Sequence, residues 1–315
     1  MVRALLLIIA FISAHPAMAG MNDIELYRAV VDEVANGGSY YETSNRLHRE
    51  NDFPTQPFVT VRSPVLAHFI ALVGHQIAYL ALLAIFNAAV IAWFIRLKGL
   101  SLAERAVFVT ILALGINLSI GGSSIYVHEN WASALICLGL AVGDDKWFIR
   151  LAIMTLAAII RELAFPILML LLIFKSQRAF TLAAIATVIT FYSFHAWQVS
   201  LQPPGVDSQG WDAMRGPSGF VSDAVTLSML TVAPWIGWPW ITASFAGWAV
   251  YARRDVLPIL WFIGVLGAIS LFAREDNLFW VLMALPLLLA GPAFLIGYLV
   301  RFFASRKGER QIGVA

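Results

Sequence analysis

Long apolar stretches, separated by short polar connections, constrain this chain more than any other feature of its sequence. Each stretch is long enough for a helix that is buried in protein or crosses a lipid bilayer. Nine such stretches lie at residues 2–19, 73–95, 106–120, 131–142, 151–174, 179–197, 234–251, 257–272 and 278–303. Two longer polar segments, 20–62 and 198–223, interrupt them.

The composition indicates the environment of the chain. Charged residues make up 13% of its 315 residues, about half the share in an ordinary soluble domain, and the mean hydropathy is +0.79. The net charge of only +2 argues against a nucleic-acid partner. The single cysteine, Cys137, excludes an intramolecular disulfide. We therefore expect an integral membrane protein, in which each buried charge needs a partner or a function.

The stretch 151–174 admits two interpretations. It is long enough for one span, but Arg161 and Glu162 interrupt it and Pro166 follows shortly afterwards. The alternative is a tight hairpin of two short helices of ~10–12 residues, which cross only part of a ~30 Å hydrocarbon core. In that case the turn with Arg161 and Glu162 lies in a cavity lined by protein.

The distribution of basic residues favours the hairpin. With a hairpin, both termini are cytoplasmic, and about 14 of the 21 basic residues but only about 5 of the 19 acidic residues lie on that side. With a single span, only about 8 basic residues remain there. The cytoplasmic basic residues are then Arg3, Arg96, Lys98, Arg105, Lys146, Arg150, Lys175, Arg178, Arg253, Arg254, Arg301, Arg306, Lys307 and Arg310. We expect an all-α, polytopic transmembrane bundle of about ten helices, a single domain over residues 1–315, in a bacterial inner (plasma) membrane.

Residues 1–19 also admit two interpretations. Arg3, the apolar run at 4–12 and the sequence Ala17-Met18-Ala19 have the pattern of a secretory signal with its cleavage site. The alternative is a short first helix that is retained and holds Asp23 at the outer membrane surface. The orientation of the remaining helices is the same in both cases.

Charged residues gather at the outer ends of the helices, in four separate connections. Their titratable members are Asp23, Glu25, His128, Glu129, Arg161, Glu162, Arg274, Glu275 and Asp276. Asp23 opens a segment whose apolar residues follow helical spacing and which ends at Gly37-Gly38, as is typical of an amphipathic helix on a membrane surface. Asp23 could cap this helix, and it could also serve as a general base.

The other outer residues also have structural and functional interpretations. His128 and Glu129 lack the second histidine of a zinc-binding H-E-x-x-H motif, so we expect a hydrogen-bonding role and no metal site. Arg161 and Glu162 could neutralise each other at a buried turn, or Arg161 could bind an anionic phosphate. Arg274 is the second candidate for such a phosphate.

These motifs resemble a known family. The first outer segment, from Asp23 through Gly37-Gly38 and Tyr40-Tyr41 to Arg62-Ser63-Pro64, resembles that of the integral-membrane glycosyltransferases of the GT-C superfamily, in particular the mannosyltransferase-like and arabinosyltransferase-like branches. The His128-Glu129-Asn130-Trp131 turn, the Arg161-Glu162 hairpin and the Arg274-Glu275-Asp276-Asn277 turn are similar to the corresponding turns of that family.

The resemblance implies an inverting transferase of the cell envelope. It would move a sugar from a polyprenyl-phosphate donor to a hydroxyl of a lipid or glycan acceptor at the outer face, among membrane lipids. Asp23 is implied as the catalytic base with Glu25 as its nearest support, and Arg161 and Arg274 as ligands of the donor phosphate. The supporting outer-face residues are His128, Glu129, Glu162, Glu275 and Asp276. Arginines can stabilise a phosphate leaving group without a metal, so no cofactor is expected.

Two other classes of function stay open. A non-enzymatic polytopic transporter or lipid-handling permease usually has ionisable residues near the bilayer midplane and internal repeats, and neither is visible here. A structural subunit of a cell-envelope complex would have no use for the outer cluster of charges.

Overall fold

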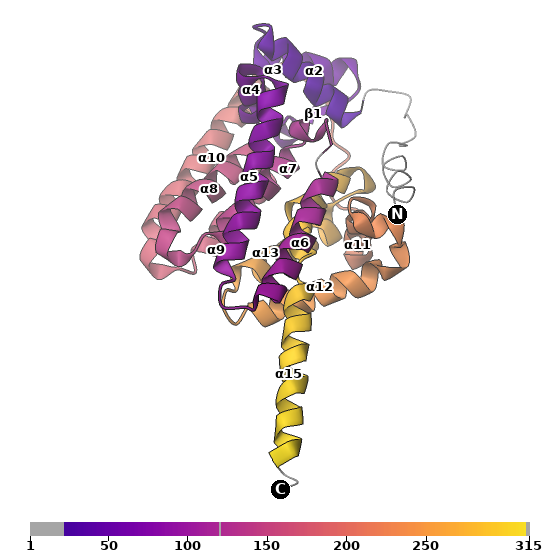
Figure 1. Ribbon diagram of the computed structural model, residues 1–315. Helices are drawn as coiled ribbons and strands as arrows, with labels where there is room; N and C mark the ends of the chain where they lie inside the picture. The colour runs from indigo at the N-terminus through magenta and orange to yellow at the C-terminus, as the bar shows by residue number, and fades with distance from the viewer. Residues whose placement is uncertain (1–21, 120, 313–315) are drawn as a thin grey trace.

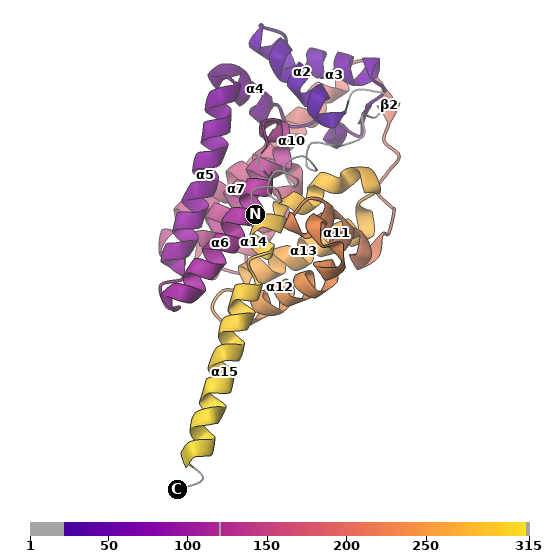
Figure 2. The ribbon, with the colours of Figure 1, turned by 45° about the vertical axis from the view of Figure 1, so that its right-hand side comes forward.

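The computed structural model describes residues 22–119 and 121–312, and this part of the chain contains fourteen α-helices and only two short strands. The all-α prediction is therefore confirmed. Both interpretations of residues 1–19 lie outside the described residues. The helices form a bundle covered at one end by α2, α3 and α4, while α15 extends beyond the opposite end (Figures 1 and 2).

Three helical stretches among the described residues are long and apolar enough to cross a membrane: His75–Arg96, Lys175–Ser200 and Leu285–Phe303. The prediction of about ten spanning helices is therefore too high. Several predicted spans form helices of only 14 to 16 residues, namely α7 (His128–Ala141), α12 (Gly237–Tyr251) and α13 (Leu257–Phe272). A helix of this length extends for about 21–24 Å, less than the ~30 Å of a hydrocarbon core.

The last predicted span, 278–303, is broken in the structure. It consists of a 3₁₀ segment η8 (Glu275–Met283), the short α14 (Leu285–Leu288) and α15 (Pro292–Ile312). The break lies against α12, where the backbones meet so closely that a Cβ on Gly247 would stand 1.8 Å from the carbonyl oxygen of Gly291. Only glycine fits such a crossing. Pro286 and Pro292 lie in the first turns of α14 and α15, and a proline cannot donate the N–H that would continue the preceding helix without an interruption.

The hairpin predicted at 151–174 is confirmed. Helix α8 (Trp147–Ile160) ends at Arg161, whose backbone is extended, and the chain returns through η4 (Glu162–Ala164) into α9 (Pro166–Leu171). Proline is well suited to the first position of a helix, because it has no N–H that would need a partner there. The single-span interpretation is excluded by this turn.

The hairpin tip lies below the end of its neighbour α10 (Arg178–Ser200). The two helices start together, since the rings of Trp147 and Phe180 are 5.1 Å apart. At the tip, the hydroxyl of Tyr192 donates to the carbonyl oxygens of residues 158 and 159 at 3.1 and 3.0 Å. Helix α10 continues for eight residues beyond Tyr192, or about 12 Å. The tip is thus recessed within the bundle.

Helix α7 is the centre of the bundle. It packs between α5 (His75–Arg96) and α8, and all of its residues except Leu138 are buried. The indole N–H of Trp93 in α5 donates to the carbonyl of Cys137 at 3.0 Å. Since α7 and α8 are antiparallel neighbours of equal length, the start of α7 and the end of α8 reach the same depth.

The cap consists of α2 (Asp23–Ala35), α3 (Tyr40–Glu50) and α4 (Pro64–Val73). The predicted amphipathic helix is confirmed as α2, which ends before Gly37 and buries Leu26, Val30 and Val31. Its N-cap, however, is Asn22, whose side chain accepts from the N–H groups of residues 24 and 25. Asp23 is the first residue inside the helix, so its proposed capping role is wrong.

The two predicted outer loops contain regular structure and contact each other. Strand β1 (Pro54–Gln56) in the first pairs in parallel with β2 (Val206–Asp207) in the second, and α11 (Gly216–Thr226) follows β2. The remaining elements are α6 (Leu102–Ser119), η1 (Phe58–Thr60), η2 (Ser124–Tyr126), η3 (Asp144–Lys146), η5 (Lys175–Gln177), η6 (Met229–Val232) and η7 (Pro234–Ile236).

Candidate functional site

A cluster of ion pairs occupies the recess at the ends of α7 and α8. Arg161 Nε donates to Glu129 Oε1 at 2.8 Å, and its Nη1 donates to the carboxylate of Glu162. Arg161 and Glu129 are each only 1% exposed. A buried charge is tolerated only with a partner of opposite sign, so these contacts explain how both groups stay ionised. The self-neutralising arrangement anticipated for Arg161 and Glu162 exists, with Glu129 as an additional partner.

Arg62 brings a second guanidinium into the same cluster. Its Nη2 lies 3.8 Å from Glu129 Oε1, and its Nε donates to the hydroxyl of Tyr27 at 2.9 Å. Its backbone carbonyl accepts from the hydroxyl of Tyr40 at 2.6 Å, which fixes the chain between β1 and α4. Its side chain keeps 16% of its surface exposed, unlike that of Arg161.

Arg62 was not predicted from the sequence to belong to this cluster. One signal was available: Arg62 is the only Asp, Glu, Lys or Arg between Asp52 and Arg96. A solitary charge within a long apolar region needs a partner of opposite sign. That partner, Glu129, is 67 positions further along the chain, a separation that local patterns do not reveal.

Asp23 borders the cluster from the first turn of α2 and is partly buried. Burial raises the pKa of its carboxyl above the usual value of 3.8. Arg62 and Arg161 act in the opposite direction, while Glu129 and Asp276 raise the pKa further. Since the charges of all four residues shift the pKa of Asp23, its carboxylate belongs to the same electrostatic cluster.

Glu25 caps the helix that carries Asp23. It is exposed, and its carboxylate accepts the backbone N–H of Asn22 at 3.0 Å. Together with the Asn22 side chain this forms a capping box, in which two free N–H groups at the start of a helix are satisfied reciprocally. Glu25 thus stabilises α2, and through α2 the position of Asp23.

The Arg274 turn lies at the edge of the cluster. The guanidinium of Arg274 forms two hydrogen bonds to Asp276, at 3.1 and 2.6 Å, and a third to the carbonyl of Gly210 at 2.6 Å. The charge of Asp276 raises the pKa of Asp23, and the charges of Asp276 and Glu275 both raise the pKa of Arg215, the ion-pair partner of Asp223. Among the described residues, the guanidinium of Arg274 therefore contacts Asp276 and the second outer loop, and it forms no hydrogen bond or ion pair with Glu129 or Glu162, the partners of Arg161.

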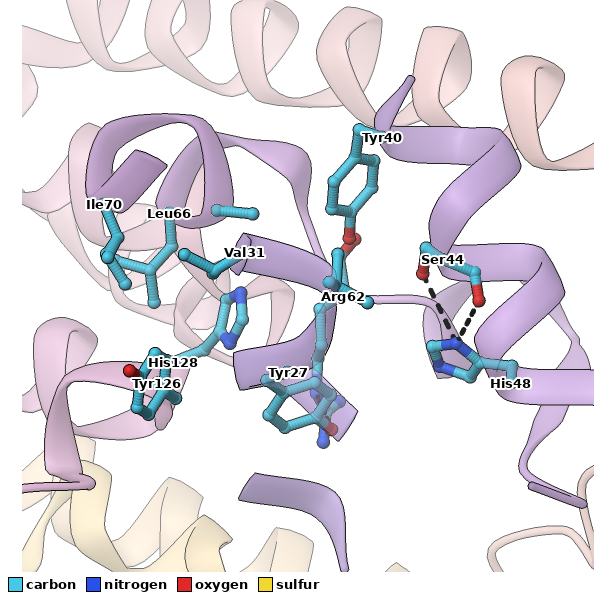
Figure 3. A pocket seen from close by; sticks show the side chains of 12 residues that line it. Tyr27, Val31, Tyr40, Ser44, His48, Arg62, Leu66, Ile70, Tyr126 and His128 are labelled. Carbon is cyan, nitrogen blue, oxygen red and sulfur yellow. Dashed lines mark hydrogen bonds between the residues drawn. The ribbon is translucent and has the colours of Figure 1, made fainter. Parts of the chain in front are cut away.

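A pocket that adjoins the cluster is lined by side chains of α2, α3 and α4, and Figure 3 shows these side chains. Figure 3 shows His128 beside Val31 and Leu66, and its ring meets that of Tyr27 edge-on at 5.6 Å. His128 is 4% exposed, and among the described residues no side chain or backbone group lies in hydrogen-bonding geometry to either of its ring nitrogens. The full lining is Tyr27, Val30, Val31, Tyr40, Ser44, His48, Arg62, Leu66, Ala67, Ile70, Tyr126 and His128.

Burial shifts the pKa values of several residues that line the pocket, among them Tyr27 and His48. Burial raises the pKa of Tyr27 to about 12, and it lowers the pKa of His48 to about 4. His48 Nδ1 donates to the carbonyl of Ser44 at 2.6 Å, as Figure 3 shows. Both side chains are therefore neutral at physiological pH. Among the described residues no group of three or more His, Cys, Asp or Glu could hold a metal ion.

The recess thus combines one partly exposed carboxylate with two guanidinium groups that are held by buried partners. A carboxylate of raised pKa can accept a proton, and guanidinium groups can stabilise a phosphate. Comparison with known proteins adds no assignment, since no family model, no curated protein and no solved structure matches the chain.

Proposed function

We propose that the chain is a multi-pass membrane glycosyltransferase of the GT-C type, which takes its sugar from a polyprenyl-phosphate donor. The proposal rests on one observation above all: Asp23, partly exposed and with a raised pKa, stands beside Arg62 and Arg161 in a recess of a helical bundle. A base next to two phosphate-binding groups is the set that sugar transfer from a phosphate donor needs.

In the proposed reaction, Asp23 accepts the proton of the acceptor hydroxyl. The acceptor oxygen then forms a bond to the anomeric carbon of the sugar, while the bond from that carbon to the phosphate oxygen breaks. The electron pair of this bond leaves with the polyprenyl phosphate, whose negative charge increases. Attack from the side opposite the leaving group inverts the configuration at the anomeric carbon.

Arg62 and Arg161 are the groups proposed to stabilise that increasing charge. Arg161 Nη1 is bound to Glu162, whose side chain is 20% exposed and can turn away, while Glu129 retains Arg161 through Nε. Arg62 is the more open of the two cations. Arg274 could bind the donor phosphate only if its guanidinium left Asp276. We therefore propose that Arg62 and Arg161 bind this phosphate.

The apolar exterior of the bundle suits a lipid-linked donor. Helices α5 and α10 expose large apolar side chains along their length, among them Ile77, Leu80, Phe194 and Trp197, each more than half exposed. Such surface is costly in water and favourable in lipid. We propose that the polyprenyl chain lies in the bilayer beside these helices, at the same end of the bundle as Asp23.

The test is sugar transfer by the full-length chain in proteoliposomes, with a panel of polyprenyl-phosphate sugars labelled in the sugar. Asp23→Asn should lower the transfer rate by about a hundredfold or more, which is the usual contribution of general base catalysis. Asp32→Asn is the matched control, because it makes the same change on the same helix, where Asp32 pairs with His75 and Arg28. Full transfer by Asp23→Asn would refute the assignment of the base.

The same proteoliposomes discriminate between transferase and transporter. A transporter or lipid-handling permease would change the flux of a solute or lipid across the bilayer and transfer no sugar from any donor. Solute or lipid flux without sugar transfer would favour that alternative, provided that the unfolding temperature of the protein shows that it is folded in the proteoliposomes.

A further inference from the structure

A second pocket lies at the end of the bundle opposite the cap. It is formed where α6 begins, α12 ends and α15 leaves the bundle, the last of which Figure 1 shows. Leu100, Val250 and Phe294 provide apolar walls, and Arg254 and Arg301 provide positive charge. These elements are distant from the recess with Asp23, so this pocket is separate from the proposed catalytic site.

Positive charge exceeds negative charge around this pocket. Arg96 pairs with Asp255 at 2.6 Å, and Arg301 pairs with Glu104. Arg254 also lines the pocket, and its side chain forms no hydrogen bond or ion pair with any other residue that the structure describes. One cation therefore remains for a ligand after the local acids have been paired.

The apolar surface beside the pocket indicates what kind of anion would bind. Helix α15 exposes Ile296, Leu299 and Val300 next to Phe294 and Arg301, with exposed fractions of 56%, 40% and 63%. A soluble anion would gain nothing from this surface. An amphiphile would place its charged group at the arginines and its hydrocarbon chain along α15.

We propose that this pocket binds the phosphate of an anionic phospholipid, with Arg254 as the principal ligand and Arg301 as the second. A basic pocket between helices at the membrane boundary is a site where an anionic headgroup gains electrostatic energy while its acyl chains stay in the bilayer. The carboxylate of Glu104 also accepts from the backbone N–H of Ser101 at 2.9 Å and so caps α6. We therefore expect Glu104 to keep its position when the phosphate binds to Arg254 and Arg301.

The experiment measures lipid bound to the purified full-length chain in detergent by native mass spectrometry. Phosphatidylglycerol should bind more tightly than phosphatidylcholine. Arg254→Gln should weaken phosphatidylglycerol binding by about fivefold, because one basic residue near an anionic lipid contributes about 1 kcal/mol of binding free energy. Arg253→Gln is the matched control, since Arg253 is the exposed neighbour that does not line the pocket. It should leave binding unchanged.

Three results would overturn the proposal. The first is equal binding of the two lipids, and the second is wild-type binding of phosphatidylglycerol by Arg254→Gln. The third is complete displacement of the lipid by inorganic phosphate, which would assign the site to a free anion. An unchanged unfolding midpoint of each variant without lipid ensures that the fold is intact. The result is independent of sugar transfer, so the two proposals stand or fall separately.

Discussion

The buried ion pair between Arg161 and Glu129 gives the sharpest stability prediction. At an effective dielectric constant of ~20, Glu129 attracts Arg161 at 2.8 Å by about 6 kcal/mol and Arg62 at 3.8 Å by about 4 kcal/mol. Glu129→Gln removes both attractions and also the cost of keeping the carboxylate out of water. Since breaking a buried pair usually costs about 3–5 kcal/mol and Arg161 keeps Glu162, we expect a loss of about 3 kcal/mol.

The assay is reversible unfolding of the full-length chain in mixed micelles, followed by tryptophan fluorescence. Glu33→Gln is the control, because Glu33 forms an ion pair of similar geometry with Arg46 on the surface, where such pairs contribute little. The double variant Glu129→Leu/Arg161→Met should recover part of the loss, because it removes the buried guanidinium that Glu129→Gln leaves without its carboxylate, although Arg62 and Glu162 still lose one partner each. A loss below about 1 kcal/mol for Glu129→Gln, or losses that simply add in the double variant, would refute a buried, ionised pair.

Three further predictions concern the cap, a helix crossing and pH. Asn22→Ala removes the cap of α2 and should lower the free energy of unfolding by about 1 kcal/mol in the same assay; wild-type stability would contradict the capping box. Gly247→Ala places a methyl group against the carbonyl of Gly291 and should cost about 1–3 kcal/mol, whereas an unchanged stability would mean that α12 and the turn before α15 are not in contact. Because burial raises the pKa of Asp23, this residue favours the folded state most below pH 3.8, and its contribution is lost as pH rises through the folded pKa. Asp23→Asn should abolish that part of the pH dependence of unfolding, and a pH profile identical to wild type would contradict it.

Local features of the sequence predicted those elements that local chemistry determines. The apolar spacing after Asp23 and the pair Gly37-Gly38 predicted α2, and the charged turn at Arg161 followed by Pro166 predicted the hairpin. In each case the signal and the element occupy the same residues. Capping was the exception, because Asn22 and Asp23 are both suitable N-cap residues and only the backbone distinguishes them.

Elements that depend on distant contacts were not predicted. The interruptions in 278–303 coincide with Pro286 and with Gly291-Pro292, which are local helix-breaking signals, whereas the close approach of Gly291 to Gly247 of α12 is visible only in the folded chain. The pairing of β1 with β2 joins segments about 150 residues apart. Apolar composition alone did not separate short helices buried in protein, such as α7, from helices that are also long enough to cross a membrane, and so the number of spanning helices was overestimated.

The candidate site was predicted only in part, because the pairing of its charges also depends on contacts between distant segments. Four connections were expected to bring charged residues to the outer ends of the helices. The structure brings three of these residues, Asp23, Glu129 and Arg161, into one cluster. Arg62 was missed because its partners lie on other helices, and Glu25 proved to be part of a local cap. Sequence patterns thus identify which charges are unusual, while their pairing depends on the tertiary structure.

The central claim, sugar transfer from a polyprenyl-phosphate donor, is tested most directly by the stoichiometry of a single reaction. Wild-type chain in proteoliposomes should release one polyprenyl phosphate for each new glycosidic bond, and the bond should have the configuration opposite to that of the donor. Release of polyprenyl phosphate without a new bond, or no consumption of any polyprenyl-phosphate sugar by folded protein, would contradict the account.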